Sequence, residues 1–213
     1  MYLAWCCYQF SPKNFIFNGD YVDKGAWGLE TFLLLLALKV FMPQNIYLHS
    51  GNHESESCTL VYGFKKEVFQ KYGDNGGNVY RKCLDCFAVL PLASIVAYQI
   101  QRTVLDPCSE DSDIILADIL WSDPTMTAGL SQNDDRGVGL FWGPDCTEQF
   151  LLKNNLKLII RSHEDPDARD GRDGFNGMDE GYTIDHSVES GKHITVFSAP
   201  DYPQFHVFSS LTF

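Results

Sequence analysis

Three short polar segments of this sequence carry side chains that could bind divalent metal ions. Residues 19–25, 51–54 and 161–164 each follow an apolar run and contain aspartate, asparagine or histidine. Carboxylate, amide oxygen and imidazole groups suit borderline ions such as Mn, Fe or Zn. Two such ions about 3.5–4 Å apart can clamp a phosphoryl group during in-line displacement, and a metal-bound water becomes a nucleophile when its pKa falls to about 7.

A proton donor is also present in these segments. His53 could act as the general acid that protonates a departing alkoxide, and Asp23 could fix the tautomer of His53. Asp20 and Asp23 could instead lie in a solvated turn, because Gly-Asp pairs are common in loops.

Short apolar strands are predicted before most of these loops, and helices between them. In α/β folds, sites form where loops leave the carboxyl ends of strands, so the loops indicate one shared site. The predicted strands are residues 15–17, 46–48, 94–100, 156–160 and 194–197. The predicted helices are residues 29–41, 62–72, 79–89 and 148–154.

The remaining segments indicate one domain over residues 1–213, without repeats or a linker. Glycine-rich residues 73–77 are predicted to separate two helices. Residues 164–181 are acidic and rich in glycine, which predicts a surface loop without a buried core.

The composition argues against nucleic acid and membranes as partners. The 213 residues are 45% hydrophobic and 21% charged, as in an ordinary globular protein, and carry a net charge of −12. This charge argues against nucleic acid or an anionic membrane as a partner. No apolar run reaches the roughly 18 residues of a membrane span, and residues 1–10 lack the basic start of a signal peptide.

The cysteines favour an intracellular protein, in the cytoplasm, the nucleus or both. Their number, seven, is odd, and their spacing is irregular, which is typical of reduced thiols. Cys83 and Cys86 have the spacing of half a zinc site, but no second pair matches them, so we predict that both pack in a helix.

Six ordered motifs resemble those of the phosphoprotein phosphatase family of serine/threonine phosphatases, of which this chain resembles an incomplete copy. Residues 25–30 and 181–186 are most similar to the plant type-7 branch. The resemblance implies an α/β metallophosphoesterase fold, the calcineurin-like α/β/β/α sandwich, with parts of its sheets missing. The matching motifs, after the segment at 19–25, are residues 51–54, 121–124, 135–138, 142–147, 161–164 and 197–202.

The resemblance also implies roles for individual residues. Asp20 would bridge two metal ions, and Asn52 and His163 would complete the second metal site. His53 and Asp23 would form the acid pair. Arg136, Lys24 and Tyr202 would contact the phosphate. The residues themselves leave two alternatives open: Arg136 could pair with Asp134 and Asp135 on the surface, and Tyr202 could be a core aromatic.

The chain departs from the family pattern at several positions. The family's Gly-Asp-x-His-Gly has no counterpart in residues 1–18, and its His-Gly-Gly does not follow residues 94–97. The first metal site therefore lacks ligands, whereas the second keeps three. Lys24 and Ser50 stand where the family has arginines, and a lysine cannot hold phosphate through two parallel hydrogen bonds.

Three hypotheses follow. The first is a metal-dependent phosphatase for phosphoserine and phosphothreonine proteins, with weak or absent activity and no indicated regulatory subunit. The second is a non-catalytic phosphatase-like binding protein. The third is a truncated gene product that does not fold stably, because unpaired strand edges invite aggregation.

Overall fold

The chain divides into two compact units, each described by itself. Unit 1 comprises Met1–Leu105 and Ser210–Phe213, and unit 2 comprises Asp106–Ser209. The single domain predicted over residues 1–213 stays a prediction. The computed structural model describes residues 7–11, 14–96, 100–103, 112–169, 172, 174–175, 178, 180–198 and 211–212.

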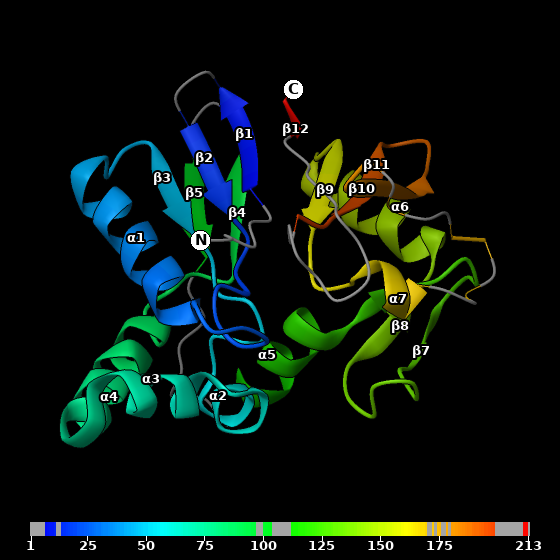
Figure 1. Ribbon diagram of the computed structural model, residues 1–213. Coiled ribbons are helices and arrows are strands. Elements are labelled where there is room, and N and C mark those ends of the chain that lie inside the picture. The colour runs from blue at the N-terminus through cyan, green and yellow to red at the C-terminus, as the bar shows by residue number, and fades with distance from the viewer. Residues whose placement is uncertain are drawn as a thin grey trace. The chain divides into compact units, whose positions relative to one another are not determined.

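A four-stranded sheet forms one side of unit 1, with the strand order β12-β1-β2-β3 (Figure 1). Strand β2 pairs antiparallel with β1 and parallel with β3. The sequence predicts β2 and β3 but not the outer strands, because β1 and β12 pair across nearly the whole chain. The strands are β1 (Cys7–Ser11), β2 (Asn14–Phe17), β3 (Ile46–Leu48) and β12 (Leu211–Thr212).

Helix α1 (Gly28–Phe41) follows the first polar loop, as predicted. Its leucine-rich sequence favours a helix, and it ends just before Pro43, which cannot donate a backbone hydrogen bond. The helix buries Phe32 and Leu35 completely, whereas Phe41 is 83% exposed. One face of α1 therefore lies in the core and the other in solvent.

The helix predicted over residues 62–72 is in fact two helices. Helix α2 (Glu56–Tyr62) and helix α3 (Phe64–Tyr72) meet at Gly63, whose φ of 118° ends the first helix. Residues 73–77 do not form a simple separator. The short 3₁₀ turn η1 (Gly73–Asn75) leads directly into α4 (Gly76–Phe87).

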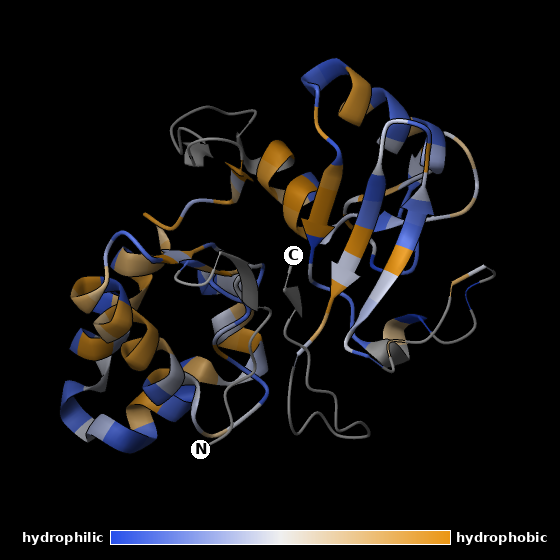
Figure 2. Cartoon of the chain, turned by 90° about the horizontal axis from the view of Figure 1, so that it is seen from above, coloured by the Kyte–Doolittle hydropathy of each residue, from blue (hydrophilic) through white to orange (hydrophobic). Residues whose placement is uncertain are grey.

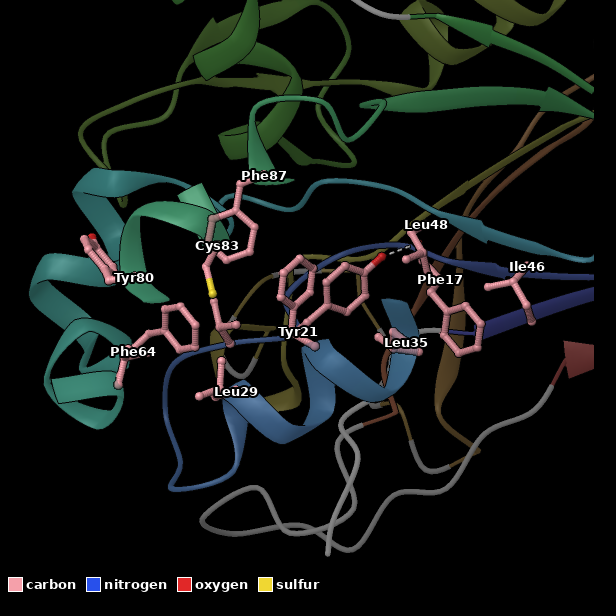
Figure 3. Packing of buried hydrophobic residues seen from close by; sticks show 13 residues of the cluster. Phe17, Tyr21, Leu29, Leu35, Ile46, Leu48, Phe64, Tyr80, Cys83 and Phe87 are labelled. Carbon is pink, nitrogen blue, oxygen red and sulfur yellow. Dashed lines mark hydrogen bonds between the residues drawn. The ribbon is translucent and has the colours of Figure 1, made fainter. Parts of the chain in front are cut away.

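The core of unit 1 joins the strands to these helices (Figure 3). Phe32 packs against Tyr21 and Phe87, with ring centroids 6.2 and 4.9 Å away. The Tyr21 hydroxyl lies within hydrogen-bonding distance of the carbonyl oxygens of Phe17 (2.8 Å) and His49 (2.7 Å). The core thereby fixes the backbone on both sides of the first polar loop.

Cys83 belongs to this core, which confirms the prediction that the cysteine pair packs in a helix. It is 5% exposed, and Cys86 packs against the same cluster from α4. Burial raises the pKa of the Cys83 thiol to about 11. A thiol with this pKa is inert at neutral pH.

The strand predicted over residues 94–100 is also wrong in its extent. Strand β4 (Ala93–Val96) pairs antiparallel with β5 (Ile100–Thr103), so the chain reverses between them. Ile95 and Val96 are each 40% exposed, and the short strand therefore lacks a fully buried face.

The described residues of unit 2 form two three-stranded sheets, with the orders β6-β8-β7 and β10-β11-β9. The sequence predicts α6, β9 and β11 but not the other elements, several of which have only two or three residues. The elements are α5 (Ser112–Trp121), β6 (Asp123–Pro124), β7 (Leu130–Gln132), β8 (Leu140–Trp142), α6 (Pro144–Asn154), β9 (Leu158–Arg161), α7 (Pro166–Arg169), β10 (Tyr182–Ser187) and β11 (Lys192–Val196).

Buried polar residues are common in unit 2. In Figure 2, β10 and β11 carry hydrophilic residues beside hydrophobic ones, and Asp185, His186 and His193 are buried among them. The prediction of a surface loop at residues 164–181 is wrong for part of that segment, because Glu164, Arg169 and Met178 are buried. Glu164 and Arg169 can be buried although both are charged, because they form an ion pair with each other.

Among the helices of the described residues, none is long and apolar enough to cross a membrane.

Replacing Phe32 by alanine should lower the free energy of unfolding by about 3–5 kcal/mol, because it leaves a cavity among buried rings. Phe41→Ala, the same change on the exposed side of α1, should alter it by less than about 0.5 kcal/mol. Urea unfolding followed by circular dichroism measures both. Equal losses for the two variants would contradict the core described above.

Candidate functional site

The loop after β2 has an unusual backbone. Asp20, Asp23 and Lys24 have φ values of 57°, 70° and 52°, in the left-handed region that residues with a side chain rarely adopt. Such strain costs of order 1 kcal/mol per residue and clusters at functional sites. The loop must therefore be held in place by its surroundings.

Glu54 supplies much of that hold. Its Oε2 accepts hydrogen bonds from the backbone N–H groups of Asp20 (2.7 Å) and Gly51 (2.9 Å). Its Oε1 accepts one from the N–H of Tyr21 (2.7 Å). Glu54 is 5% exposed, so this buried carboxylate ties the first polar loop to the second. Sequence reasoning assigned Glu54 no role.

The two loops also touch directly. A Cβ atom at Gly51 would lie 2.2 Å from Oδ1 of Asp20 and 2.7 Å from its backbone nitrogen. A Cβ atom at Gly19 would lie 2.0 Å from the nitrogen of Gly51. Only glycine allows this approach, which brings the backbone of residues 51–54 against Asp20.

The structure places His53 and Asp23 in contact. Nδ1 of His53 lies 2.9 Å from Oδ2 of Asp23, and Oδ1 of Asp23 accepts from the backbone N–H of Phe64 (2.8 Å). The Asp23 side chain is fully buried and that of His53 is 10% exposed. Asp23 therefore orients the imidazole, with the help of the N-terminus of α3.

Nearby carboxylates favour the protonated form of His53. Burial opposes a charge on the ring, but the hydrogen bond that the ring donates to Asp23 and the charge of Asp20 outweigh it and raise the pKa of His53 above its ordinary value. Burial and the charge of Asp20 also raise the pKa of Glu54, to about 7. A protonated imidazole of this kind can donate a proton to a leaving group.

Unit 1 also holds two of the predicted metal ligands. Asn52 is 4% exposed, and Oδ1 of Asp20 accepts a hydrogen bond from the N–H of His53 (3.3 Å). His163, the third, belongs to unit 2 and has a φ of 97°. Within the described parts of the chain, no three His, Cys, Asp or Glu side chains group so as to hold a metal ion.

The predicted phosphate contacts are divided in the same way. Lys24 is exposed in unit 1, and Tyr202 lies outside the described residues. Arg136 lies in unit 2, where its Nε donates to Oδ2 of Asp123 and its Nη2 to Oδ1 (3.4 Å). The alternative pairing with Asp134 and Asp135 is wrong, because the carboxylate that Arg136 contacts is Asp123.

Asp123 belongs to a larger set of buried charges, here called the arginine cluster. Arg161 links two of its carboxylates, through Nη2 to Asp123 (3.1 Å) and Nη1 to Glu164 (2.6 Å). Arg169 links Glu164 (3.0 Å) to Asp185. The cluster consists of Asp123, Glu164, Asp185, Arg136, Arg161, Arg169 and Arg172.

The cluster keeps Asp123 ionised. Burial disfavours the charge, but the guanidinium groups of Arg161 and Arg136 outweigh it and hold the pKa of Asp123 at about 2. Asn133 adds a hydrogen bond of 3.0 Å from its side-chain nitrogen. No local sequence pattern reveals the cluster, because its members lie on several separate segments of unit 2.

Two buried histidines adjoin the cluster. The ring nitrogens of His186 lie 2.7 Å from Oγ1 of Thr147 and 2.8 Å from the carbonyl oxygen of Thr125. His193 is completely buried, with Nδ1 3.4 Å from Asp185. Burial lowers the pKa of His186 below its usual value and that of His193 well below it, and nearby arginines add to the effect.

Known proteins resemble this chain over most of its length. Residues 8–166 match the family model described as Calcineurin-like phosphoesterase. Serine/threonine-protein phosphatase 7 of Arabidopsis thaliana is 55% identical over 240 residues, covering 91% of this chain and 58% of that protein. The serine/threonine-protein phosphatase 7 long form homolog of the same plant is 45% identical and covers 91% of this chain and 18% of that protein.

A solved structure agrees with these matches. The protein serine/threonine phosphatase from Saccharomyces cerevisiae with similarity to human phosphatase PP5 has a TM-score of 0.66 and 31% identity, covering 91% of this chain and 61% of that one. The predicted calcineurin-like α/β fold class is thereby confirmed. This chain spans less than two thirds of each of these relatives.

The match with phosphatase 7 also shows a difference in internal length. The aligned stretch with phosphatase 7 is 240 residues long, which exceeds the 213 residues of this chain. That relative therefore carries residues inside the aligned stretch that this chain lacks.

Replacing Glu54 by alanine should destabilise the fold by about 2–4 kcal/mol, because three backbone N–H groups lose their buried acceptor. Glu56 is exposed, two residues further along, in the first turn of α2. Glu56→Ala removes only the favourable interaction of its charge with the helix dipole and should lower the free energy of unfolding by less than about 1 kcal/mol. Urea unfolding at neutral pH compares the two. A small loss for Glu54→Ala would show that other contacts hold the loops.

The contributions of His186 and His193 to stability should fall as the pH is lowered from 7 to 5, against the opposite contributions of His53 and Glu54, whose pKa values are raised. The folded pKa values of His186 and His193 are depressed, so the unfolded chain binds more protons below its histidine pKa of about 6.5. Each histidine can contribute at most about 1.4 kcal/mol per pH unit below that value. In urea unfolding, the stability of His193→Gln relative to the unmodified chain should rise as the pH is lowered from 7 to 5, and a difference that does not change with pH would contradict the prediction.

Proposed function

We propose that this chain, which belongs to the calcineurin-like phosphoesterase family and within it to the phosphoprotein phosphatases near the type-7 branch, hydrolyses phosphoserine and phosphothreonine esters in proteins with reduced efficiency. The relatives are named serine/threonine-protein phosphatases, and this chain spans only part of each. Its own activity and substrates are therefore proposals.

The observation that carries this proposal is the buried pair of His53 and Asp23. A contact of 2.9 Å between Nδ1 and the carboxylate leaves Nε2 as the nitrogen that can serve a substrate. The surrounding carboxylates raise the pKa of His53, so that the ring carries a proton to donate. Protonation of a serine or threonine alkoxide by His53 would assist departure from phosphorus.

A divalent metal ion is implied by the family, but the described residues fit it only in part. Unit 1 offers Asp20 and Asn52, two of the three protein ligands that a catalytic metal commonly has, and the third candidate, His163, belongs to unit 2. We therefore derive no step through a metal, and Mn, Fe or Zn remains a proposal. The absence of the family's Gly-Asp-x-His-Gly and His-Gly-Gly from this sequence supports the proposed reduction in efficiency.

The shorter internal length supports the same conclusion. Residues that phosphatase 7 carries within the aligned stretch are absent here, and the resemblance places a missing His-Gly-Gly after residues 94–97. Lys24 also offers a point charge where an arginine would bind phosphate through two bonds. Both differences weaken the site without removing the His53–Asp23 pair.

The proposed partner is a phosphorylated protein. The net charge of −12 disfavours nucleic acid and anionic membranes, and no regulatory subunit is proposed. A non-catalytic phosphoprotein-binding role is the second candidate, favoured by the incomplete set of metal ligands.

Phosphate release from a phosphoserine peptide in the presence of Mn tests the proposal. The chain should release phosphate slowly, and His53→Ala should lower the rate about 10²–10⁴-fold through loss of the acid. Phe41→Ala, exposed on α1, should keep the rate of the unmodified chain. Release no faster than that of His53→Ala would exclude the enzyme, and peptide binding without release would then favour the second candidate.

A further inference from the structure

A further set of polar contacts lies beside the two loops of unit 1, and the proposed function does not use it. Nε2 of His49 lies 2.6 Å from Oγ of Ser94, and Nδ1 of His49 lies 3.1 Å from Oδ1 of Asn18. Both distances are within the range of hydrogen bonds. The three side chains therefore connect a hydroxyl group, through an imidazole ring, to an amide oxygen.

The contact with Asn18 determines which ring nitrogen of His49 carries the proton. An amide oxygen can only accept a hydrogen bond, so Nδ1 of His49 donates to Oδ1 of Asn18. In a neutral imidazole the other nitrogen, Nε2, then carries a lone pair. The hydroxyl of Ser94 therefore donates to Nε2, and the lone pair faces the proton that a base would have to remove.

The sheet of unit 1 holds His49 and Asn18 together. Phe17 of β2 and Leu48 of β3 are partners in the parallel register, so Asn18 and His49 follow at the same level of two neighbouring strands (Figure 1). The N–H of His49 donates to the carbonyl oxygen of Phe17 (2.8 Å), and the Tyr21 hydroxyl lies 2.7 Å from the carbonyl oxygen of His49. His49 is 7% exposed, so its ring is enclosed as well as hydrogen-bonded.

The serine comes from a different segment and reaches the surface. Ser94 lies in β4, and the N–H of Ser50 donates to the carbonyl oxygen of Pro91 (2.9 Å), which holds the segment before β4 beside the residue that follows His49. Ser94 is partly exposed, and its neighbour Ile95 is 40% exposed. The serine is therefore accessible to a reagent in solution, whereas its histidine partner is buried.

We propose that Ser94, His49 and Asn18 act as a nucleophile, a base and an orienting residue, and that Ser94 accepts the acyl group of an activated ester. A nucleophile that is hydrogen-bonded to a base, which a third group orients, is recognised by its geometry and not by its position in the sequence. The proposal is independent of His53 and Asp23, and it stands whether or not the chain hydrolyses phosphate esters.

The reaction uses only the ester, these side chains and water. Oγ of Ser94 attacks the carbonyl carbon while Nε2 of His49 takes the hydroxyl proton, and the bond from that carbon to the leaving oxygen then breaks. His49 returns the proton to the departing oxygen, which gives an acylated Ser94 and a free alcohol or phenol. Attack by water, assisted by His49, releases the acid and restores the serine.

The leaving group of the ester follows from the groups that the site contains. Donors that stabilise the oxyanion of the tetrahedral intermediate commonly supply the largest part of catalysis by such sites. We assign a nucleophile and a base here but no oxyanion donor, so the substrate class is an ester whose leaving group departs readily, such as an aryl ester.

Acetylation by p-nitrophenyl acetate tests the proposal on the full chain. Release of p-nitrophenol gives the overall rate, and peptide mass spectrometry locates the acetyl group. Ser94 should be acetylated at least about 100-fold faster than Ser131, an exposed serine of β7, because a general base contributes about 10²–10⁴-fold. Absence of the acetyl group from Ser94, or equal rates at the two serines, would overturn the proposal.

His49→Gln tests the base. Glutamine can form hydrogen bonds but cannot accept the proton, so acetylation of Ser94 should slow by at least about 100-fold. Ser131→Ala, the control, should leave the rate at Ser94 unchanged. Acetylation of Ser94 in His49→Gln at the rate of the unmodified chain would refute activation by His49.

Variants of Asn18 cover the case in which His49→Gln does not fold. Asn18→Ala should slow acetylation of Ser94 by at least about tenfold, because the ring loses the acceptor that fixes its tautomer. Asn18→Asp should restore the rate of the unmodified chain or exceed it, because a carboxylate accepts the same hydrogen bond and stabilises the charged ring. If Asn18→Ala reacts as fast as the unmodified chain, or as fast as Asn18→Asp, the assignment of the three roles is wrong.

Discussion

The candidate site of unit 1 depends on one carboxylate that accepts three backbone N–H groups. Glu54 binds Asp20, Tyr21 and Gly51, and so holds together two loops that leave neighbouring parallel strands. Without such an anchor, the left-handed backbone of Asp20 would relax more readily, because that conformation has a steric cost for any residue with a Cβ atom. His53 precedes Glu54 in the chain, so the same hydrogen bonds help to place His53 beside Asp23.

In unit 2, buried ion pairs place the functional side chain. Its candidate phosphate residue, Arg136, is oriented by a buried carboxylate and not by backbone hydrogen bonds. Asp123, Glu164 and Asp185 are neutralised in turn by arginines from several segments. Burial of so many charges is tolerated because each has a partner of opposite sign. Precise placement of side chains thus comes from electrostatics in unit 2 and from the backbone in unit 1.

Sequence reasoning succeeded where the signals were local. Strands β2 and β3 and helix α1 were predictable because apolar runs end at glycine, aspartate or proline. The break at Gly63 was missed because it depends on the backbone angle that this glycine adopts. The reversal between β4 and β5 was missed because it depends on the pairing of the two strands. The His53–Asp23 pair was predicted from the residue types in the two loops and from the resemblance, whereas Glu54 and Arg172 were missed because their contacts join distant segments.

The buried ion pairs of unit 2 have a consequence for the conditions under which it keeps its shape. Dissolved salt screens exposed charges strongly but buried pairs weakly. Heating reduces the penalty for stripping water from charged groups, whereas the hydrophobic contribution per unit area levels off. The arginine cluster of unit 2 should therefore stay folded at high salt concentration and at elevated temperature better than a surface held by isolated exposed ion pairs.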